Sequence, residues 1–539
     1  MNSIEFALFA LVAFLGYKII STWRDRARLI KLRGPPSPGW FYGLSKDLFQ
    51  GDAAEFFEKW FNEYGYAFQV AGPLGERRTV LFDPKAIGYF FSKETYSFTQ
   101  SGFQRKAIEA IIGKGLLYAE GESHRRQRRA LTPAFSVAAL RNLTPVFYDS
   151  AYKVKSAWDV LIHSSPSNEA IIDVQKWMNS VSLDSVGIAG FGHDFGSLED
   201  RKSTVRSLFD SVGTTPHSSS GARRGLSLLL PLLSPVLPIL LMVPTKRKKV
   251  IGRLHESMAD ISNVLLDRSR KEREAGLQDV KGSAGQTLIG ALLKAENSDS
   301  SLTMTPDEVL SQMKVLILAG YETTSISLTW ALIELALHPD KQDKLREELS
   351  EFSQSDPSYD QLTNALPYLD CVTREILRLH PPLGQISRVA AKDEVVPFSN
   401  PINLPNDPQA SSLPIARGAQ IIIPVRAIQR STVIWGPDAK EFRPERWAKG
   451  EEGLPETVKL FGGYHHLLTF VDGQRICLGR GFALAEFKSV LSVLVRNFVF
   501  EMRDGPDTKI EDIVTILRRP KVVGEEGFAL PMKVRRYES

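Results

Sequence analysis

The chain has 539 residues, of which 43% are hydrophobic, and its formal net charge is +5. This length suits one large domain or two to three ordinary domains, and the apolar content is normal for a globular core. The mild positive charge argues against dedicated nucleic-acid binding and fits an acidic partner or an anionic membrane surface. Two cysteines cannot make a disulfide framework or a four-ligand zinc site, so we expect the catalytic part to work in a reducing compartment.

The N-terminal segment is predicted to be a membrane anchor. Phe6–Ile20 is nearly all apolar, and Arg24 begins a basic stretch shortly after it. The apolar run is short for a membrane span, so Lys18 would have to reach toward the interface. In the competing interpretation, a cleaved signal peptide, the positive charges would precede the apolar run. We therefore predict an uncleaved transmembrane anchor at residues 1–20 with its basic side in the cytoplasm, a basic and Pro-rich hinge at 21–45, and a catalytic domain at 46–539.

Hydrophobic periodicity predicts a mainly α-helical body with a minor β part. Alternation around two glycines predicts a short strand pair at Tyr66–Phe82. The further predicted elements, in chain order, are helices at Pro84–Phe91, Ser136–Ser156, Ile171–Phe191, Lys249–Ala275, Pro306–Leu337, Pro339–Glu351 and Tyr368–Leu379, a buried strand at Ile421–Ile428, and a helix at Phe482–Phe500. The Pro-rich stretches Glu394–Pro414 and Trp435–Pro455 are predicted to be connections.

One apolar segment does not fit a simple helix. Leu226–Val243 is almost wholly apolar, but three prolines interrupt it and basic residues flank it on both sides. Prolines at this density oppose one straight membrane-spanning helix, so a second membrane span is a less favoured alternative. A buried core segment is the other alternative. We favour a segment that inserts into the membrane surface and whose basic flanks meet lipid headgroups.

The segment Phe470–Gly479 places a cysteine in a turn that precedes a predicted helix. A sulfur that ligates a metal must be a thiolate, so its surroundings must favour the charge. Gly473 and Gly479 allow tight turns and close backbone approach on either side of Cys477. Backbone N–H groups of the turn and of the helix start can point at the sulfur and stabilise it. Arg475 adds a cation two residues away.

A lone cysteine is most often a small buried apolar residue, and this is what we predict for Cys371. Around Cys477, in contrast, Phe470, Gly473, Arg475 and Gly479 complete the pattern F-x-x-G-x-R-x-C-x-G. This pattern resembles the haem-binding loop of cytochromes P450. The resemblance implies the cytochrome P450 fold, haem b as cofactor, Cys477 as the axial ligand of the haem iron, and Arg475 as a partner of a haem propionate.

A second motif, Ala319–Thr324, lies inside the long predicted helix. It resembles the oxygen-activating motif of cytochromes P450. The Thr323 hydroxyl can bond the carbonyl of Ala319 four residues earlier and loosen the helix locally, while Gly320 would leave room for dioxygen. The resemblance implies that Glu322 and Thr323 relay protons during oxygen activation. Taken alone, the pattern also fits a glycine defect beside an exposed acid.

A third motif, E-x-x-R, places Glu375 and Arg378 three residues apart on a predicted helix, where they can meet on one face. Surface ion pairs at this spacing are common, so the signal is weak alone. Further along, Phe442–Trp447 resembles another P450 motif that supplies a second arginine. The resemblance implies a buried structural network of Glu375, Arg378 and Arg446.

The stretch from His124 to Arg129 resembles the W-x-x-x-R motif of the family, with His124 in place of the tryptophan. At a spacing of four residues, His124 and Arg128 share a helix face and can reach propionate oxygens. Arg388 resembles the other propionate-binding arginine of the family. The remaining arginines of the stretch predict a basic surface on which an acidic reductase docks; a solvated basic face is the simpler alternative.

The resemblance covers nearly the whole chain after the hinge. It implies a monooxygenase of the endoplasmic reticulum membrane with a cytosolic catalytic domain, fed by NADPH through cytochrome P450 reductase, with cytochrome b5 as a further candidate donor. A mostly apolar predicted pocket suits a lipophilic small molecule. The overall sequence resembles fungal members of the family, which favours a role in secondary metabolism, with terpenoids as one substrate class. The alternatives are an isomerase or dehydratase with the same fold and a non-catalytic, membrane-tethered haem or lipid binder.

Overall fold

The computed structural model describes residues 31–50, 52–199, 303–514, 517–525 and 527–538, with scattered positions elsewhere. Most of the predicted membrane anchor, most of the predicted helix Lys249–Ala275, and the whole segment Leu226–Val243 lie outside the described residues. Within them, one helix, Pro306–Leu337, is long and apolar enough to cross a membrane, and 67% of its most apolar window is buried in the protein. Such burial is what the core helix of a globular body shows.

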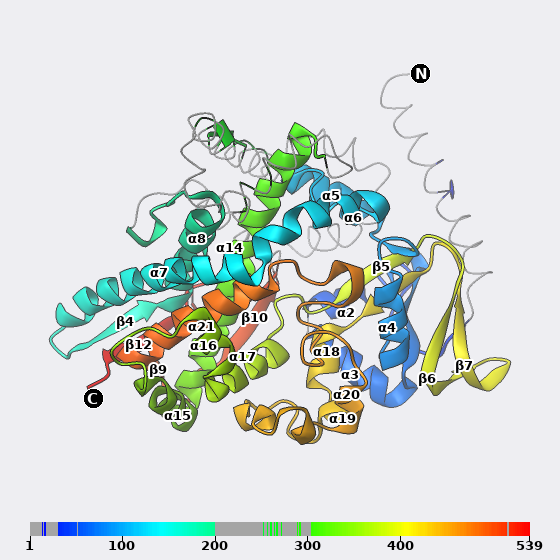
Figure 1. Ribbon diagram of the computed structural model, residues 1–539. Coiled ribbons are helices and arrows are strands. Elements are labelled where there is room, and N and C mark those ends of the chain that lie inside the picture. Colours follow the sequence, from blue (N-terminus) through cyan, green and yellow to red (C-terminus); the bar gives the residue numbers. More distant parts are fainter. Residues whose placement is uncertain are drawn as a thin grey trace, which may run out of the picture.

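Helices make up most of the described chain, as predicted, and Figure 1 shows the longest of them, α14, running through the middle of the molecule. The helices are α2 (Ser45–Gln50), α3 (Ala53–Tyr64), α4 (Pro84–Ser92), α5 (Gly102–Ile112), α6 (Gly121–Leu131), α7 (Val137–His163), α8 (Val174–Phe191), α14 (Pro306–Leu337), α15 (Pro339–Ser350), α16 (Tyr359–Asn364), α17 (Pro367–Leu379), α18 (Val425–Arg430), α19 (Thr432–Trp435), α20 (Glu456–Lys459) and α21 (Arg480–Asn497). α14 packs on α8, and α21 packs on α7 and α14.

The strands form a minor part of the described chain (Figure 1). They are β1 (Ala67–Ala71), β2 (Arg77–Leu81), β3 (Phe98–Thr99), β4 (Glu169–Asp173), β5 (Ile386–Ala390), β6 (Glu394–Leu404), β7 (Asp407–Ile415), β8 (Gln420–Ile423), β9 (Phe498–Met502), β10 (Ile510–Val514), β11 (Arg518–Val522) and β12 (Pro531–Arg536). The largest sheet has the order β1-β2-β8-β5-β3, with β2 and β8 parallel. A second sheet, β4-β12-β9, and the pairs β6-β7 and β10-β11 are antiparallel.

The bounds predicted for α14 are confirmed, and its first turn explains why it begins at Pro306. The Thr305 hydroxyl accepts a hydrogen bond from the N–H of Glu308 at 3.2 Å, and the Glu308 carboxylate accepts one from the N–H of Thr305 at 2.9 Å. This capping box satisfies two N–H groups that the helix itself leaves without partners, and proline suits the first helical position. The strand pair β1-β2 is also confirmed.

Three predicted elements were wrong in part. Ile421–Ile428 was predicted as one strand, but β8 ends at Ile423 and α18 follows Pro424, which has no N–H to continue a ladder. The stretch predicted as a Pro-rich connection at Glu394–Pro414 is the hairpin β6-β7, which tolerates its prolines because it is paired on only one side. The helix predicted from Ile171 begins at Val174, because the preceding residues pair with β12 as β4.

The start of the described chain is attached to the largest sheet. The N–H of Gln69 on β1 donates to the carbonyl of Arg33 at 3.0 Å, and Leu32 is buried. A Cβ at Gly34 would lie 1.8 Å from the carbonyl oxygen of Gln69, so only glycine permits this approach. The Pro-rich segment that follows is non-helical, as predicted.

Candidate active site

The loop around Cys477 lies between α20 and the start of α21. The N–H of Cys477 donates to the carbonyl of Phe470 at 2.8 Å, which closes the loop on itself. Gly473 has φ +64°, and a Cβ there would lie 2.4 Å from the carbonyl oxygen of Phe91 on α4. Close backbone approach therefore requires glycine at this position, as predicted. At Gly479 a Cβ would come no closer than 3.7 Å, to a ring carbon of Phe135, so neighbouring side chains leave that position open.

The sulfur of Cys477 is accessible, but it lies in a buried environment. Its side chain keeps exposed surface, whereas Cys371 is buried as predicted. Nevertheless, burial raises the pKa of the Cys477 thiol, against the lowering effects of the Gly479 N–H, Arg128 and Arg480. Both observations hold if the sulfur faces an enclosed space rather than bulk solvent. Surrounding protein therefore excludes bulk water from the sulfur and disfavours its charged form.

The predicted propionate-binding residues come together beside this loop from three elements. Arg128 on α6 donates to the carbonyl of Ile476 at 2.7 Å, next to Cys477. His124 lies one turn earlier and is only 3% exposed. Desolvation, together with the charges of Arg475 and Arg128, lowers the pKa of His124 to about 3, so its imidazole is neutral. Arg388 on β5 is the third contributor, and burial lowers the pKa of its guanidinium.

Two carboxylates that sequence reasoning missed pair with these arginines. Arg475 Nη2 lies 2.6 Å from Oε2 of Glu120, the residue before α6, and also donates to the carbonyl of Ala119. Arg388 Nη2 lies 2.6 Å from Oε1 of Glu94, in the loop after α4. Glu94 and Glu120 carry no local pattern that marks them, because their partners are distant in the chain.

The middle of α14 presents an open face in an otherwise buried helix. Ala319 is exposed and Thr323 is half-buried, while most residues on either side along the helix are buried. The Thr323 hydroxyl donates to the carbonyl of Ala319 at 2.7 Å, as predicted. The structure adds a second constraint on Gly320: a Cβ there would lie 2.7 Å from Cγ2 of Val186 on α8. This glycine therefore permits close packing of two helices.

Glu322 has a partner that the motif did not predict. Its Oε1 lies 2.6 Å from Nη2 of Arg519 on β11, and the two side chains are 3% and 1% exposed. Oε2 of Glu322 is buried without a hydrogen-bond partner among the described residues. The Arg519 guanidinium also lies over the ring of Phe528. The acid expected to be exposed, if the motif were merely a helix defect, is thus a buried member of an ion pair.

The predicted network of Glu375, Arg378 and Arg446 is assembled and buried. Arg378 donates to Glu375 through Nε at 2.9 Å and through Nη2 at 2.7 Å, and both side chains have no exposed surface. Arg446 Nε is more distant, at 3.4 Å from Glu375 Oε1. Trp447 Nε1 and the N–H of Arg443 complete the donors to this carboxylate, at 2.9 and 3.1 Å.

Gln429 connects this network to the cysteine loop. Its amide nitrogen donates to the carbonyl of Arg378 at 2.9 Å, and its amide oxygen accepts from the N–H of Leu468 at 2.7 Å. The side chain is fully buried. Its contacts supply the mechanical link between α17 and the segment that leads to Cys477.

The predicted basic surface is smaller than expected. Arg125 and Arg129 are exposed, but Arg126 is half-buried and pairs with Glu308 of α14 at 2.5 Å. It also donates to the carbonyl of Thr303. Arg126 therefore attaches α6 to the start of α14 instead of adding charge to the surface.

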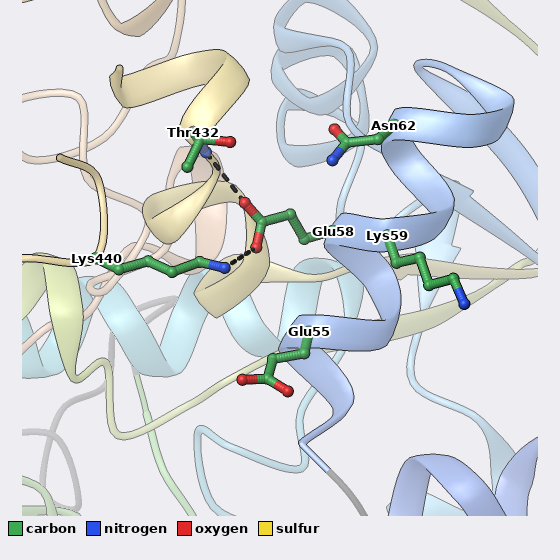
Figure 2. A pocket seen from close by; sticks show the side chains of 6 residues that line it. All are labelled: Glu55, Glu58, Lys59, Asn62, Thr432 and Lys440. Carbon is green, nitrogen blue, oxygen red and sulfur yellow. Dashed lines mark hydrogen bonds and ion pairs between the residues drawn. The ribbon is translucent and has the colours of Figure 1, made fainter. Parts of the chain in front are cut away.

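A surface hollow between α3 and α19 is separate from all of these residues. Figure 2 shows Glu58 at its centre, where it accepts from the N–H of Thr432 at 3.1 Å and pairs with Lys440 at 2.7 Å. No residue of the predicted site lines it. The pair of Glu58 and Lys440 joins its two sides, so we assign it to the packing of α3 against the α18–α19 region.

The residues beside Cys477 fit an iron porphyrin. A thiol with free surface supplies a sulfur ligand, and the open face of α14 leaves Ala319 and Thr323 uncovered. Nε of both Arg388 and Arg475 is buried without a hydrogen-bond partner among the described residues, as expected for donors that await anionic groups. Haem carries two propionates, which such donors bind well.

The whole chain matches one family. The family model for cytochrome P450 matches residues 33–523, and the chain therefore belongs to the cytochrome P450 family, whose members carry haem; it is a cytochrome P450 monooxygenase. The chain is 49% identical to the cytochrome P450 monooxygenase claP of Ampulloclitocybe clavipes, covering 100% of this chain and 99% of that protein. It is 50% identical to claQ of the same fungus, covering 98% and 97% of the two chains. It is 32% identical to cytochrome P450 monooxygenase 205 of Postia placenta, covering 95% and 93%.

Proposed function

We propose that this monooxygenase holds haem b through Cys477 and hydroxylates a lipophilic small molecule with dioxygen and electrons derived from NADPH. The observation that carries the proposal is the position of Cys477, which has a free sulfur surface beside a cluster of arginines. Arg128, Arg388 and Arg475 would hold the propionates, with neutral His124 as a further polar contact. Haem bound there would supply oxygen activation, which thiolate donation favours.

The chain's own residues would control proton supply. Thr323 offers a hydroxyl on the open face of α14, and its bond to Ala319 holds the hydroxyl in place. Glu322 is adjacent and ion-paired with Arg519, so it can hold a charge while buried. Together they would transfer protons to the open face of α14, while the surrounding apolar core excludes water.

A lipophilic substrate is supported by the apolar residues that border this face. α5 contacts α14, and its half-buried Ile111 packs with Leu316 and Leu116 in one cluster. Apolar walls with few polar groups suit a hydrophobic ligand. We further propose a role in secondary metabolism, with terpenoids as one candidate class. The names of the fungal relatives identify monooxygenases without naming a substrate.

We propose that the protein is anchored in the endoplasmic reticulum membrane by residues 1–20 and receives electrons from NADPH–cytochrome P450 reductase, with cytochrome b5 as a second donor. The apolar N-terminal sequence and its basic flank support the anchor. Exposed Arg125 and Arg129 on α6 offer a docking contact for an acidic reductase surface.

The test of the cofactor assignment uses the two cysteines as a matched pair. The reduced protein under carbon monoxide should show the absorption band of thiolate-ligated haem. Cys477→Ser should lose this band, and Cys371→Ser should keep it, because Cys371 is buried in the core. A band that survives Cys477→Ser would overturn the assignment.

The test of the reaction uses reductase, NADPH and labelled dioxygen. A hydroxylated product that carries one oxygen atom from dioxygen would support the proposal. Turnover of a lipid peroxide without NADPH would instead identify the isomerase or dehydratase alternative, and haem binding with no turnover of any lipophilic candidate would identify the binder.

A further inference from the structure

A buried carboxylate lies between two of the arginines assigned to the haem propionates. Glu94 has no exposed surface; its Oε1 is 2.6 Å from Nη2 of Arg388 and 4.0 Å from Nε of Arg475. Arg388 is its charged partner at close range, and no backbone N–H among the described residues donates to either oxygen of Glu94. A buried carboxylate with both oxygens in this state has capacity for another partner.

Three connections fix Glu94 in this position. The following strand, β3, pairs with β5, which carries Arg388. The N–H of Gly121 at the start of α6 donates to the Thr95 carbonyl at 3.1 Å and to the Thr95 hydroxyl at 2.9 Å. On the other side, α4 meets the cysteine loop where Gly473 approaches Phe91. The carboxylate is therefore held among the elements that carry the propionate-binding residues.

The charges of this cluster do not balance once haem is present. Arg388 and Arg475 are each paired with one carboxylate, Glu94 and Glu120, and Arg128 beside Cys477 adds one positive charge in excess. The two propionates of haem would turn this into one negative charge in excess. Uptake of one proton by a carboxylate restores neutrality, and two carboxylates that share a buried site characteristically share a proton.

We propose that Glu94 is a further haem-binding residue, which takes up a proton from solvent when haem binds and shares it with the propionate held by Arg388 and Arg475. The inference rests on the haem site set out under the proposed function. Glu94 is favoured over Glu120 because Glu120 has a well-aligned bond from Arg475 at 2.6 Å and a second from the N–H of Gln100 at 2.9 Å.

The direction of the pH dependence follows from the groups around Glu94. Burial raises the pKa of Glu94, while Arg388 and Arg475 oppose this and Glu120 adds to it. Lys93 next to it is directed away, over the ring of Tyr89. A propionate beside Glu94 raises the pKa of Glu94 further. At a pH between the pKa of Glu94 without haem and its pKa with haem, haem binding is therefore accompanied by uptake of a proton. Haem is then held most tightly below the lower pKa, and its retention is lost as the pH rises through the higher one.

The experiment measures release of haem from the full-length holoprotein to excess apomyoglobin, from about pH 6 to about pH 9. In wild type the release rate should rise with pH, by up to about tenfold for each pH unit. Glu94→Gln should release haem slowly with a flat pH profile, and Glu120→Gln should keep the wild-type slope. A wild-type slope in Glu94→Gln, or faster release than wild type at every pH, would overturn the proposal.

A second measurement needs no mutation. Wild type reconstituted with the dimethyl ester of haem lacks ionisable propionates, so its release rate should not depend on pH in this range. A persistent slope would contradict the inference, whether or not Glu94→Gln folds. Failure of the cofactor assignment is distinguishable, because it would appear as a missing thiolate band under carbon monoxide.

Discussion

Arg519 Nη2 lies 2.6 Å from Oε1 of Glu322, and the pair joins β11 to the centre of α14 with almost no exposed surface. The two residues are separated by 197 positions in the chain. This pairing holds the acid of the oxygen-activating motif at one defined place. A buried ion pair contributes little net stability, but loss of one partner leaves a charge that the interior cannot solvate.

Replacement of Arg519 by methionine should lower the free energy of unfolding by about 3–5 kcal/mol, because Glu322 would remain buried without its counter-ion. The double variant Arg519→Met with Glu322→Gln should recover much of this loss, since neither charge remains. Arg518→Met is the control, because Arg518 is 3.9 Å from its nearest acid, Asp512. Urea denaturation measures the effect, and a stable Arg519→Met single variant would show that the pair is not needed.

Replacement of Thr323 by alanine should leave stability nearly unchanged, because a hydroxyl bonded to a helix carbonyl contributes little to it. The yield of product per NADPH should fall by about tenfold or more, with peroxide released instead, since a proton donor is lost. Thr323→Ser should retain the yield. Thr329→Ala is a matched control: its hydroxyl makes the same kind of bond, to Ser325 at 2.8 Å, but it is fully buried away from the open face. Equal effects of the two alanine variants would contradict the assigned role.

Removal of the Glu375 side chain should yield protein without haem. Arg378 would lose two hydrogen bonds and remain as a buried charge, at a cost of about 3–5 kcal/mol. The effect should reach the cysteine loop through Gln429, which bonds both Arg378 and Leu468. Haem content per protein measures it, with the exposed Glu347→Ala as control. Normal haem content in Glu375→Ala would show that the network does not support the loop.

Glu486 on α21 should make the protein less stable as the pH rises. Its carboxyl group is fully buried beside Ser182, Ser185 and Thr324, and burial raises its pKa well above the usual range. Neither oxygen has a well-aligned hydrogen bond among the described residues. The folded protein therefore keeps a proton that the unfolded chain releases, so stability is full below about pH 4.3 and declines above it by up to about 1.4 kcal/mol per pH unit, until the folded pKa is passed.

The variant Glu486→Gln isolates this effect, because it removes the ionisable group and keeps the shape. It should be more stable than wild type at neutral pH, with an advantage that grows as the pH rises. Melting temperature against pH gives the comparison, and the exposed Glu452→Gln serves as control. An advantage that shrinks with rising pH would show that Glu486 is ionised in the folded protein.

Much of the site was predictable because its key pairs are close in the chain. Thr323 and Ala319 are four residues apart on one helix, and Glu375 and Arg378 are three apart, so helical geometry alone brings each pair together. The same holds for the long helix α14, whose bounds were predicted from the periodicity of its apolar residues. The prediction for Ile421–Ile428 failed because Pro424, which has no N–H, ends β8. The prediction for Glu394–Pro414 failed because a hairpin paired on only one side tolerates its prolines.

By itself, the sequence determined the cysteine loop, the family and the order of the main helices, since each depends on spacing within one segment. Only the tertiary structure decided which charges meet. Arg519 reaches Glu322, and Glu94 reaches Arg388, from parts of the chain far from any motif. Ion pairs depend on distance in space, and the folding of β11 and of the loop after α4 against the core creates those distances. The same packing assigned Gly320 to the contact with Val186, which its place in the oxygen-activating motif had not indicated.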